Sequence, residues 1–373
     1  MSSGQDVLFE MSYCRGMSTT EDPPGTHRSP IGSILSDDLR RTVAPPAVRE
    51  GQRPRLVSDA DWAHASLQYE LEDRPTPPPV PNGWYALLAS DELTPGDLRA
   101  LIAVGRELVA YRDQEGVAHV VDAHCPHMGA HLGGGAVVGD TLQCPYHAWR
   151  YGPDGMCVEI PYSDTRIPSK ACLRTYPVHE TAGMVLFWFH HAGAAPTYEV
   201  PETEEHDSDG WTAPHPWRFE LVAALQEMAE NNVDYAHLWH VHGRAAVPDR
   251  TSEFVMDGPF STVVEQLPDG VEFHRNTYGP GIAVLRVPGL MTILAATTPI
   301  DRRHCRLLWH FYFAEHAAGL AEDMIAGVTG EYGLMADVPI WQDKVYLERP
   351  LLVKGDGNIA EFRRWYSQFY EGA

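Results

Sequence analysis

Short apolar segments separated by turn-forming residues mark the first folded part of the chain, which begins near Gly83. The segments 107–112 and 117–121 are rich in β-branched and aromatic residues and flank an Asp-Gln-Glu-Gly stretch, which predicts a β-hairpin. The continuous apolar run 184–189 is typical of a buried strand. These segments predict a small antiparallel domain that ends before the Ala-, Pro-, Glu- and Asp-rich segment 193–210.

The second half of the chain predicts a helix from about Ala223 and then a larger curved antiparallel sheet. The segment 218–221 opens this part, and the expected strands are 261–264, 270–275, 282–287, 291–297 and 306–313. Expected helices at 320–334 and 359–369 cover the sheet. Strands grouped apart from helices indicate an α+β fold.

The N-terminal part shows little periodicity. Residues 1–55 are rich in Ser, Pro, Arg and Asp and are expected to form a mobile tail. A short helix at 62–71 and an extended Pro-rich connector at 75–81 follow. We therefore expect three regions: a tail with its connector over 1–82, a small domain over 83–195 and a catalytic domain over 196–373.

Composition narrows the function. A chain of 373 residues with 44% hydrophobic content can bury two cores, and its net charge of −23 argues against a nucleic-acid partner. The longest apolar stretch, 281–300, is interrupted by Arg286 and Pro288, so no membrane-spanning segment is expected. No basic region followed by an apolar stretch opens the chain, so we expect a cytoplasmic protein.

Two Cys-and-His pairs form the most informative motif. Cys125-Pro126-His127 is followed after sixteen residues by Cys144, with His147 three positions later. This spacing suits a two-iron, two-sulfur centre in which two histidines replace two cysteines on one iron. A structural zinc site is the alternative, since two Cys and two His can close a tetrahedron. The glycines after the first pair favour the iron–sulfur centre, because that loop must fold closely over inorganic sulfur.

A second motif lies about ninety residues further along. Asp234 precedes His237 by one helical turn, and His242 follows five positions later. Two imidazoles and one distant carboxylate form the ligand set of non-haem Fe(II) oxygenases. With 19 histidines in the chain, such a pair is expected about once by chance, so its position downstream of the first motif carries the argument.

At these motifs the chain resembles the oxygenase component of Rieske non-haem iron oxygenases, in the branch that includes 3-ketosteroid 9α-hydroxylases and Neverland-type sterol desaturases. The resemblance covers roughly residues 83 to 371. It implies a small antiparallel β Rieske [2Fe-2S] domain followed by a helix-grip catalytic domain. It assigns the cluster ligands to Cys125, His127, Cys144 and His147. It assigns two ligands of the mononuclear iron to His237 and His242.

The resemblance also assigns two carboxylates and an amide. Asp234 matches a carboxylate that links a cluster histidine of one subunit to an iron-ligand histidine of its neighbour, and Asn231 matches an Asn near the iron. Asp337, just before an Ile-Trp pair, matches the third iron ligand. Rivals remain for two of these positions: His240 for His242, and Glu331, Asp343 or Glu348 for Asp337.

The function that the resemblance implies is that of a terminal oxygenase. It would use O₂ and electrons relayed from NAD(P)H to hydroxylate a hydrophobic small molecule such as a steroid, as a homotrimer. The chain has no Cys-x₄-Cys-x₂-Cys run and no Gly-x-Gly-x-x-Gly loop, so a separate ferredoxin, flavin reductase or both would supply the electrons.

Three other functions are weighed against this one. A secondary-metabolite tailoring oxygenase, performing oxidative cyclisation, amine oxidation or desaturation, would share all the motifs. A Rieske electron carrier would end near residue 195, whereas this chain continues into the second motif. A scaffold protein with decayed metal sites would be expected to lack a ligand, and all of them are present.

Overall fold

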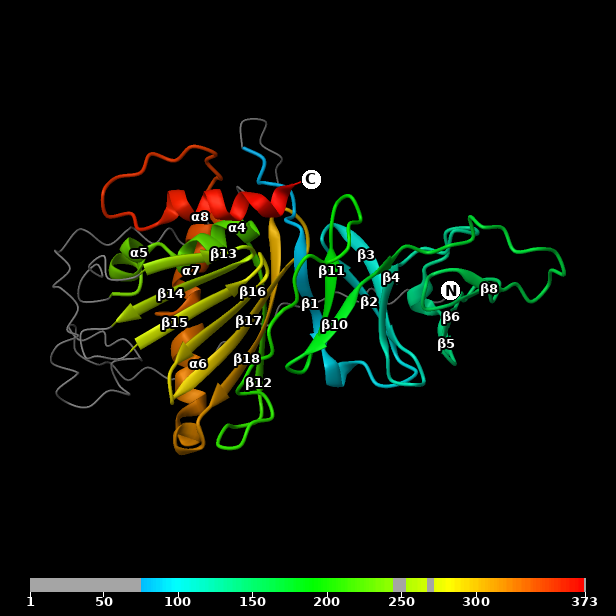
Figure 1. Cartoon of the computed structure of the whole chain (residues 1–373), viewed down its shortest axis with the longest axis horizontal. Helices are drawn as coiled ribbons and strands as arrows, with labels where there is room; N and C mark the ends of the chain where they lie inside the picture. Colours follow the sequence, from blue (N-terminus) through cyan, green and yellow to red (C-terminus); the bar gives the residue numbers. More distant parts are fainter. Residues whose placement is uncertain (1–74, 244–252, 267–271, 372–373) are drawn as a thin grey trace, which may run out of the picture.

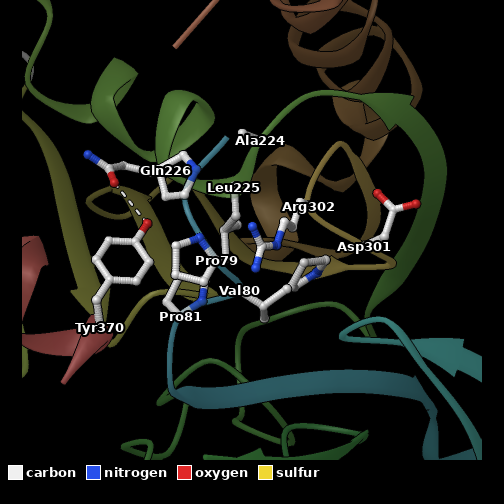
Figure 2. A pocket seen from close by; sticks show the side chains of 11 residues that line it. Pro79, Val80, Pro81, Ala224, Leu225, Gln226, Asp301, Arg302 and Tyr370 are labelled. Atoms are coloured by element: carbon white, nitrogen blue, oxygen red, sulfur yellow. Dashed lines mark hydrogen bonds between the residues drawn. The ribbon is translucent and has the colours of Figure 1, made fainter. Parts of the chain in front are cut away.

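The computed structural model describes residues 75–243, 253–266 and 272–371. The expected tail at 1–55 and helix at 62–71 lie outside these residues. The Pro-rich connector lacks regular secondary structure and lies beside a shallow pocket (Figure 2) that includes Gln226 and Tyr370. The hydroxyl of Tyr370 donates to Oε1 of Gln226 at 2.8 Å, so the C-terminal segment meets the connector and the start of α4 here.

The first part of the chain is antiparallel β with two short 3₁₀ turns, η1 (Ser90–Glu92) and η2 (Leu132–Gly134). Three sheets have the orders β1-β11-β10, β2-β3-β4-β9 and β5-β6-β7-β8. The pairing of β3 with β4 confirms the predicted hairpin, and β11 is the predicted buried strand. The strands are β1 (Gly83–Ala89), β2 (Leu98–Ala103), β3 (Arg106–Arg112), β4 (Ala118–Asp122), β5 (Ala136–Val138), β6 (Thr141–Gln143), β7 (Arg150–Tyr151), β8 (Cys157–Glu159), β9 (Thr175–Tyr176), β10 (Val178–Thr181) and β11 (Met184–Phe189).

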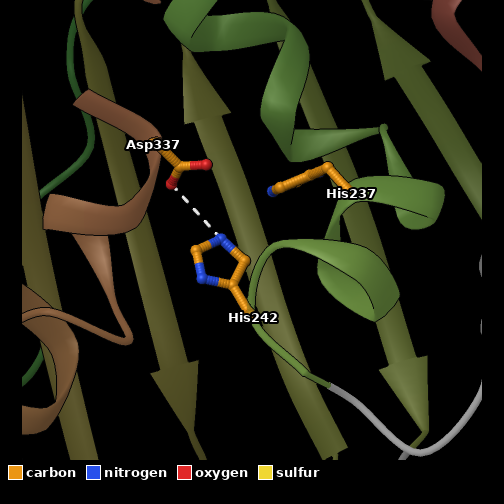
Figure 3. Close-up of side chains that lie close together, drawn as sticks. All are labelled: His237, His242 and Asp337. Atoms are coloured by element: carbon orange, nitrogen blue, oxygen red, sulfur yellow. Dashed lines mark ion pairs between the residues drawn. The ribbon is translucent and has the colours of Figure 1, made fainter. Parts of the chain in front are cut away.

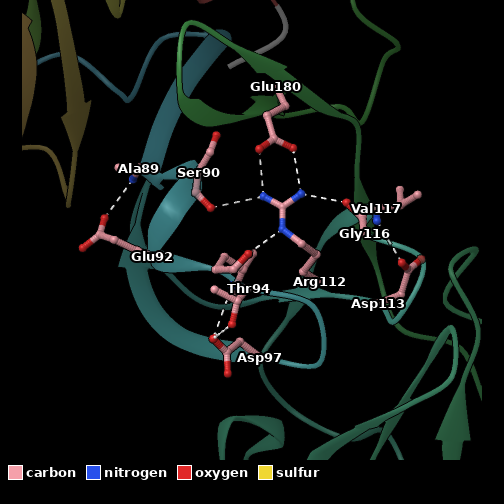
Figure 4. Close-up of polar contacts among 11 residues, drawn as sticks. Ala89, Ser90, Glu92, Thr94, Asp97, Arg112, Asp113, Gly116, Val117 and Glu180 are labelled. Carbon is pink, nitrogen blue, oxygen red and sulfur yellow. Dashed lines mark hydrogen bonds and ion pairs between the residues drawn. The ribbon is translucent and has the colours of Figure 1, made fainter. Parts of the chain in front are cut away.

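A buried arginine joins two of these sheets (Figure 4). Arg112 on β3 is 8% exposed and forms a two-point ion pair with Glu180 on β10 at 2.8 and 2.9 Å. Its remaining donors reach backbone carbonyls, among them those of Leu93 and Gly116. Because every arm of the guanidinium is used, the charge is accommodated in the interior and fixes how the sheets meet.

The second part is built on one seven-stranded antiparallel sheet with the order β12-β18-β17-β16-β15-β14-β13 (Figure 1). The sheet has two strands more than the sequence predicted, at 215–222 and 253–257. The strand predicted at 270–275 is described from Glu272 and extends to Tyr278, and residues 270 and 271 lie outside the described residues. The strands are β12 (His215–Val222), β13 (Glu253–Asp257), β14 (Phe260–Gln266), β15 (Glu272–Tyr278), β16 (Ile282–Val287), β17 (Met291–Pro299) and β18 (His304–Phe313).

The helices pack on one face of this sheet and at its end. The prediction of a single helix over 320–334 is wrong, because the helix is interrupted at Gly330 and Gly333, between the end of α6 and the start of α7. A Cβ atom on Gly333 would lie 2.1 Å from the carbonyl oxygen of Val328, so only glycine permits this turn. The helices are α4 (Leu225–Ala229), α5 (Tyr235–His240), α6 (Ala321–Thr329), α7 (Leu334–Asp343) and α8 (Ile359–Tyr366), with short 3₁₀ turns η3 (Glu230–Asn232), η4 (Glu315–Leu320) and η5 (Ser367–Tyr370).

The two parts share a hydrophobic core. Trp84 and Trp188 of β1 and β11 pack with Val284, Leu294 and neighbouring residues on one face of the large sheet. The opposite face of the sheet packs against α6, α7 and α8. No helix among the described residues is long and apolar enough to cross a bilayer.

Candidate metal centres

Two tight turns carry the Cys-and-His pairs at the ends of β4 and β6. In the first, the amide of Gly129 donates to the carbonyl of Cys125 at 2.9 Å, and Gly129 has φ +75°. In the second, the amide of Ala148 donates to the carbonyl of Cys144 at 3.1 Å, with φ +57° at Ala148. The left-handed backbone at Gly129 and at Ala148 lets the chain reverse direction within a single turn, so the Cys and His of each pair face the same side.

The two turns bring all four side chains together. Cys125 and Cys144 are each 2% exposed, and the rings of His127 and His147 lie with centroids 4.8 Å apart. Burial raises the pKa of the Cys144 thiol, while the backbone amides of Tyr146 and His147 favour the thiolate. Nδ1 of His147 is buried with no hydrogen-bond partner among the described residues. A buried nitrogen of this kind beside two buried sulfurs fits a metal cluster.

Three aromatic residues around this group were not identified from the sequence. The Tyr151 hydroxyl lies 3.0 Å from Sγ of Cys125, and the Trp149 ring stacks on His127 at 4.3 Å. Trp149 in turn donates through Nε1 to the Tyr162 hydroxyl at 2.8 Å. Burial, and then the nearby Cys125 thiol, raise the pKa of Tyr151, so its hydroxyl stays protonated and can donate to sulfur. The position of Tyr151, four residues after His147, was the one sequence feature that could have placed this tyrosine beside the group.

A second group lies over the large sheet (Figure 3). His237 on α5, His242 after α5 and Asp337 on α7 place one ligand atom each within 4.8 Å of the others. Nε2 of His242 lies 3.2 Å from Oδ2 of Asp337, and the two imidazole centroids are 5.2 Å apart. Asp337 is 7% exposed. Two imidazoles and a carboxylate with this mutual spacing fit a mononuclear Fe(II).

Backbone carbonyls orient both imidazoles. Nδ1 of His237 donates to the carbonyl of Asp234 at 2.5 Å, and Nδ1 of His242 donates to the carbonyl of Tyr332 at 3.0 Å. A ring that donates from Nδ1 carries its lone pair on Nε2. In both rings Nε2 is therefore the atom that would bind a metal, which supports the fit to a metal.

The segment before His237 is held by the C-terminal helix. Arg363 of α8 donates to both carboxylate oxygens of the buried Glu230, at 2.8 and 2.9 Å. Gly357 approaches the same segment so closely that a Cβ there would lie 2.1 Å from the carbonyl oxygen of Val233. These contacts place Asp234 at the start of α5, where Oδ1 accepts the amides of Ala236 and His237 at 3.1 and 3.2 Å.

The remaining expected site residues lie nearby. Although burial opposes it, the hydrogen bonds from His237 hold the pKa of Asp234 below its usual value. Asn231 is half-buried in η3, two residues before Val233. Of the rivals, His240, Glu331 and Glu348 are exposed, and Asp343 lies a further six positions along α7. Among the described residues, only Asp337 completes the group with His237 and His242.

Comparison with known proteins matches the chain in two parts. Residues 83–177 match the Rieske [2Fe-2S] domain, and residues 187–370 match the 3-ketosteroid 9alpha-hydroxylase C-terminal domain. The chain is 33% identical over 334 residues to cholesterol 7-desaturase nvd of Xenopus laevis, covering 79% of this chain and 72% of that protein. It is 31% identical over 320 residues to the 3-ketosteroid-9-alpha-monooxygenase oxygenase component of Rhodococcus rhodochrous, covering 77% and 82%.

Solved structures show the same fold at lower sequence identity. NdmA of Pseudomonas putida CBB5 with caffeine has a TM-score of 0.67 and 18% identity, covering 77% of this chain and 90% of NdmA. Apo dicamba monooxygenase has a TM-score of 0.60 and 16% identity, covering 78% and 97%. At these identities the likeness concerns the fold alone.

Proposed function

The chain belongs to the Rieske oxygenases that include the 3-ketosteroid 9α-monooxygenase oxygenase components and the cholesterol 7-desaturases, and on that premise we propose that it oxidises a C–H bond of a steroid or a similarly hydrophobic molecule. It is an oxidoreductase with a Rieske cluster and a mononuclear iron, and it uses O₂. The observation that carries the proposal is the group of His237, His242 and Asp337 in a chain whose relatives act on sterols and ketosteroids.

We assign the cluster to Cys125, His127, Cys144 and His147, and the mononuclear iron to His237, His242 and Asp337. When held by these residues, the cluster would supply single electrons, and the iron would supply the chemistry that activates O₂. The chain's own residues hold these groups in place: backbone carbonyls fix both imidazoles, and the ion pair of Arg363 with Glu230 anchors their segment. Asp234 caps α5 beside His237 and is the proposed carboxylate between the two centres, with Asn231 close to it.

The electron donors and the assembly are also proposals. The oxygenase component of a multi-component system receives its electrons from a ferredoxin, a flavin reductase or both. Exposed side chains surround the two turns that carry the Cys-and-His pairs, called the cluster turns below. Met128 is 63% exposed, Tyr146 60% and Tyr162 61%. This apolar surface supports docking of another protein surface, and a head-to-tail homotrimer would present each cluster to the iron site of the next subunit. We place the protein in the cytoplasm, where reduced thiolates persist.

Product analysis tests the proposed reaction. The iron-loaded protein is supplied with NADH, a flavin reductase, a ferredoxin and ¹⁸O₂, and then with androstenedione or cholesterol in separate reactions. We expect one product that either gains a labelled oxygen atom or loses two hydrogen atoms. If the protein carries its full complement of iron, yet neither compound stimulates NADH oxidation and both are recovered unchanged, a sterol or ketosteroid substrate is contradicted.

A further inference from the structure

A buried ion pair on the large sheet has one unused donor. Arg275 on β15 is 6% exposed, and its Nη2 donates to Oε2 of Glu265 on β14 at 2.6 Å, where Glu265 is 1% exposed. The guanidinium also lies over the Phe273 ring, 4.8 Å from its centroid, which holds the orientation of the plane. Nη1 of Arg275 is buried with no hydrogen-bond partner among the residues that the structure describes.

The strand register places Arg275 on the helix-covered face of the sheet. Its directly opposite partners are Val263 on β14 and Leu285 on β16, and opposite residues of antiparallel strands point to the same face. Val263 belongs to the apolar cluster against which Leu238 of α5 packs, while Leu285 packs with the cluster under α6. Arg275 therefore lies between two apolar clusters. The neighbouring strand β14 contributes Val263 to the cluster that contacts α5, the helix that carries His237.

A second arginine in the same sheet shows what a purely structural pair looks like. Arg286, next to Leu285 on β16, points to the opposite face because side chains alternate along a strand. Its Nε and Nη2 donate to both oxygens of the buried Glu205, at 2.7 and 3.2 Å, and Thr292 donates to the same carboxylate. No atom of Arg286 is among the unpartnered buried atoms of the described chain. Arg275 differs in keeping a donor open.

We propose that Nη1 of Arg275 donates a hydrogen bond to a neutral oxygen acceptor, a carbonyl or hydroxyl oxygen, of the hydrophobic substrate. This inference rests on the proposed function. A buried donor without an acceptor costs free energy that a ligand oxygen would recover. Because Glu265 already balances the charge of Arg275, an added carboxylate would leave a net negative charge in an apolar setting, and a neutral acceptor would not. The apolar clusters on both sides suit the hydrocarbon part of the same molecule.

Four ligands that differ only in their carbonyl groups test the inference: androstane-3,17-dione, androstan-3-one, androstan-17-one and androstane. Their dissociation constants are measured on the iron-loaded holoenzyme in oxygen-free buffer, from the quenching of tryptophan fluorescence. We expect the wild type to bind one of the two monoketones about tenfold or more tightly than androstane, the advantage of one buried hydrogen bond.

The test variant is Arg275→Met combined with Glu265→Gln, so that no unpaired charge stays buried. Its matched control on the other face is Arg286→Met with Glu205→Gln. We expect the Arg275 variant to lose the preference for the ketone while its affinity for androstane changes little, and the control to keep the preference. Arg275→Lys keeps a cation for Glu265 without the second arm of the fork, so it should lose most of the preference and serves if the double variant does not fold.

The outcomes separate the two hypotheses. If the wild type binds all four compounds equally, or the Arg275 variants keep the ketone preference, the role of Arg275 is wrong and Nη1 meets only water, while a steroid substrate stands. If the wild type binds none of the four compounds, the proposed steroid substrate fails and the inference fails with it.

Discussion

Single residues in the cluster turns set the surroundings of the proposed iron–sulfur centre. The Tyr151 hydroxyl contacts Cys125, and the Trp149 ring stacks on His127. Ala148 occupies a left-handed backbone position that glycine adopts at lower cost. These residues hold no metal in our assignment, so they can be changed while the ligands stay in place.

Tyr151→Phe should lower the reduction potential of the cluster. A hydrogen bond to a thiolate sulfur stabilises the reduced, more negative state, and losing about 1 kcal/mol corresponds to roughly 40 mV for one electron. Potentiometric titration of the visible absorption measures the shift. Tyr176→Phe is the control, because that buried hydroxyl donates to Asp122 at 2.7 Å instead of to a cysteine. Equal potentials in the wild type and Tyr151→Phe would show that the hydroxyl does not tune the centre.

Ala148→Gly should stabilise the protein. A non-glycine residue at φ +57° costs about 1 to 2 kcal/mol, and glycine's extra freedom in the unfolded chain offsets about 0.5 to 1 kcal/mol of this, so the unfolding midpoint should rise by a few degrees. The melting of the loaded protein, followed at the cluster absorption, checks the rise. Ala136→Gly on the exposed strand β5 is the control and should lower the midpoint, since glycine there only adds freedom to the unfolded chain. A lower midpoint for Ala148→Gly would contradict the expected relief of strain.

Elements far apart in sequence meet at the proposed iron site. α5 supplies His237, and α7 supplies Asp337 after the break at Gly330 and Gly333. The break lets α7 begin in a new direction over β12 and β18, where Leu334 and Val338 pack. A continuous helix through residue 334 would have placed Asp337 elsewhere.

Asp337→Ala should empty the mononuclear site. Two imidazoles alone hold Fe(II) weakly, so bound iron should fall from three toward two atoms per chain, while the cluster absorption stays. Iron analysis with visible spectroscopy measures both. Asp343→Ala, on the same helix, should keep three. Full iron in Asp337→Ala would remove Asp337 from the ligand set.

Asp234→Asn should keep its iron. Its pre-reduced cluster should nevertheless be oxidised slowly in a single turnover, because the proposed link between the two centres is altered.

Glu227→Gln tests a buried carboxyl between α4 and α7. Glu227 is 3% exposed, burial raises its pKa, and Nζ of Lys344 lies 3.7 Å away, beyond hydrogen-bond distance. A carboxyl with a raised pKa in the folded state binds its proton more tightly there, so its stability contribution is greatest at low pH and is lost as pH rises through the folded pKa. The variant should match the wild type below the unfolded pKa of a glutamate, exceed it increasingly as pH rises above that value, and keep a constant advantage once the raised folded pKa is passed.

Denaturant unfolding at a series of pH values gives this comparison. Glu361→Gln, exposed on α8, is the control and should follow the wild-type profile. Parallel profiles for Glu227→Gln and the wild type would mean that Glu227 titrates in the folded protein as it does in the unfolded chain.

At the scale of the whole molecule, the two proposed metal centres belong to separate sheets of one chain. The cluster turns lie at the ends of β4 and β6, while the iron group lies over the seven-stranded sheet. In the proposed homotrimer, the exposed residues around the cluster turns would face a neighbouring subunit. Assembly would then decide whether electrons cross between subunits.

Mixed oligomers test this arrangement. Cys144→Ser should lack the cluster and Asp337→Ala the mononuclear iron, so each protein alone should be inactive. In co-expressed trimers, random assembly places an intact cluster beside the intact iron of a neighbour at roughly a quarter of the contacts, and activity should return to about that fraction. Mass measurement in solution confirms the mixed trimers. Purified mixed trimers without activity would show that electrons do not pass between subunits.

The sequence by itself determined the chemistry of each turn and the class of the fold. Cys125 with His127, and Cys144 with His147, lie within single loops, where neighbouring residues decide which side chains face together. The antiparallel strands and the α+β class followed from local apolar patterns, because burial of one face imposes a period on the chain.

Only the tertiary structure decided the contacts between distant elements. The choice of Asp337 over Glu331, Asp343 or Glu348 depends on the glycine break before α7 and on how that helix packs. The pairing of Arg275 with Glu265 depends on strand register, in which a shift of one residue would turn each side chain to the other face. Such contacts arise from packing across the whole molecule, which local propensity does not encode.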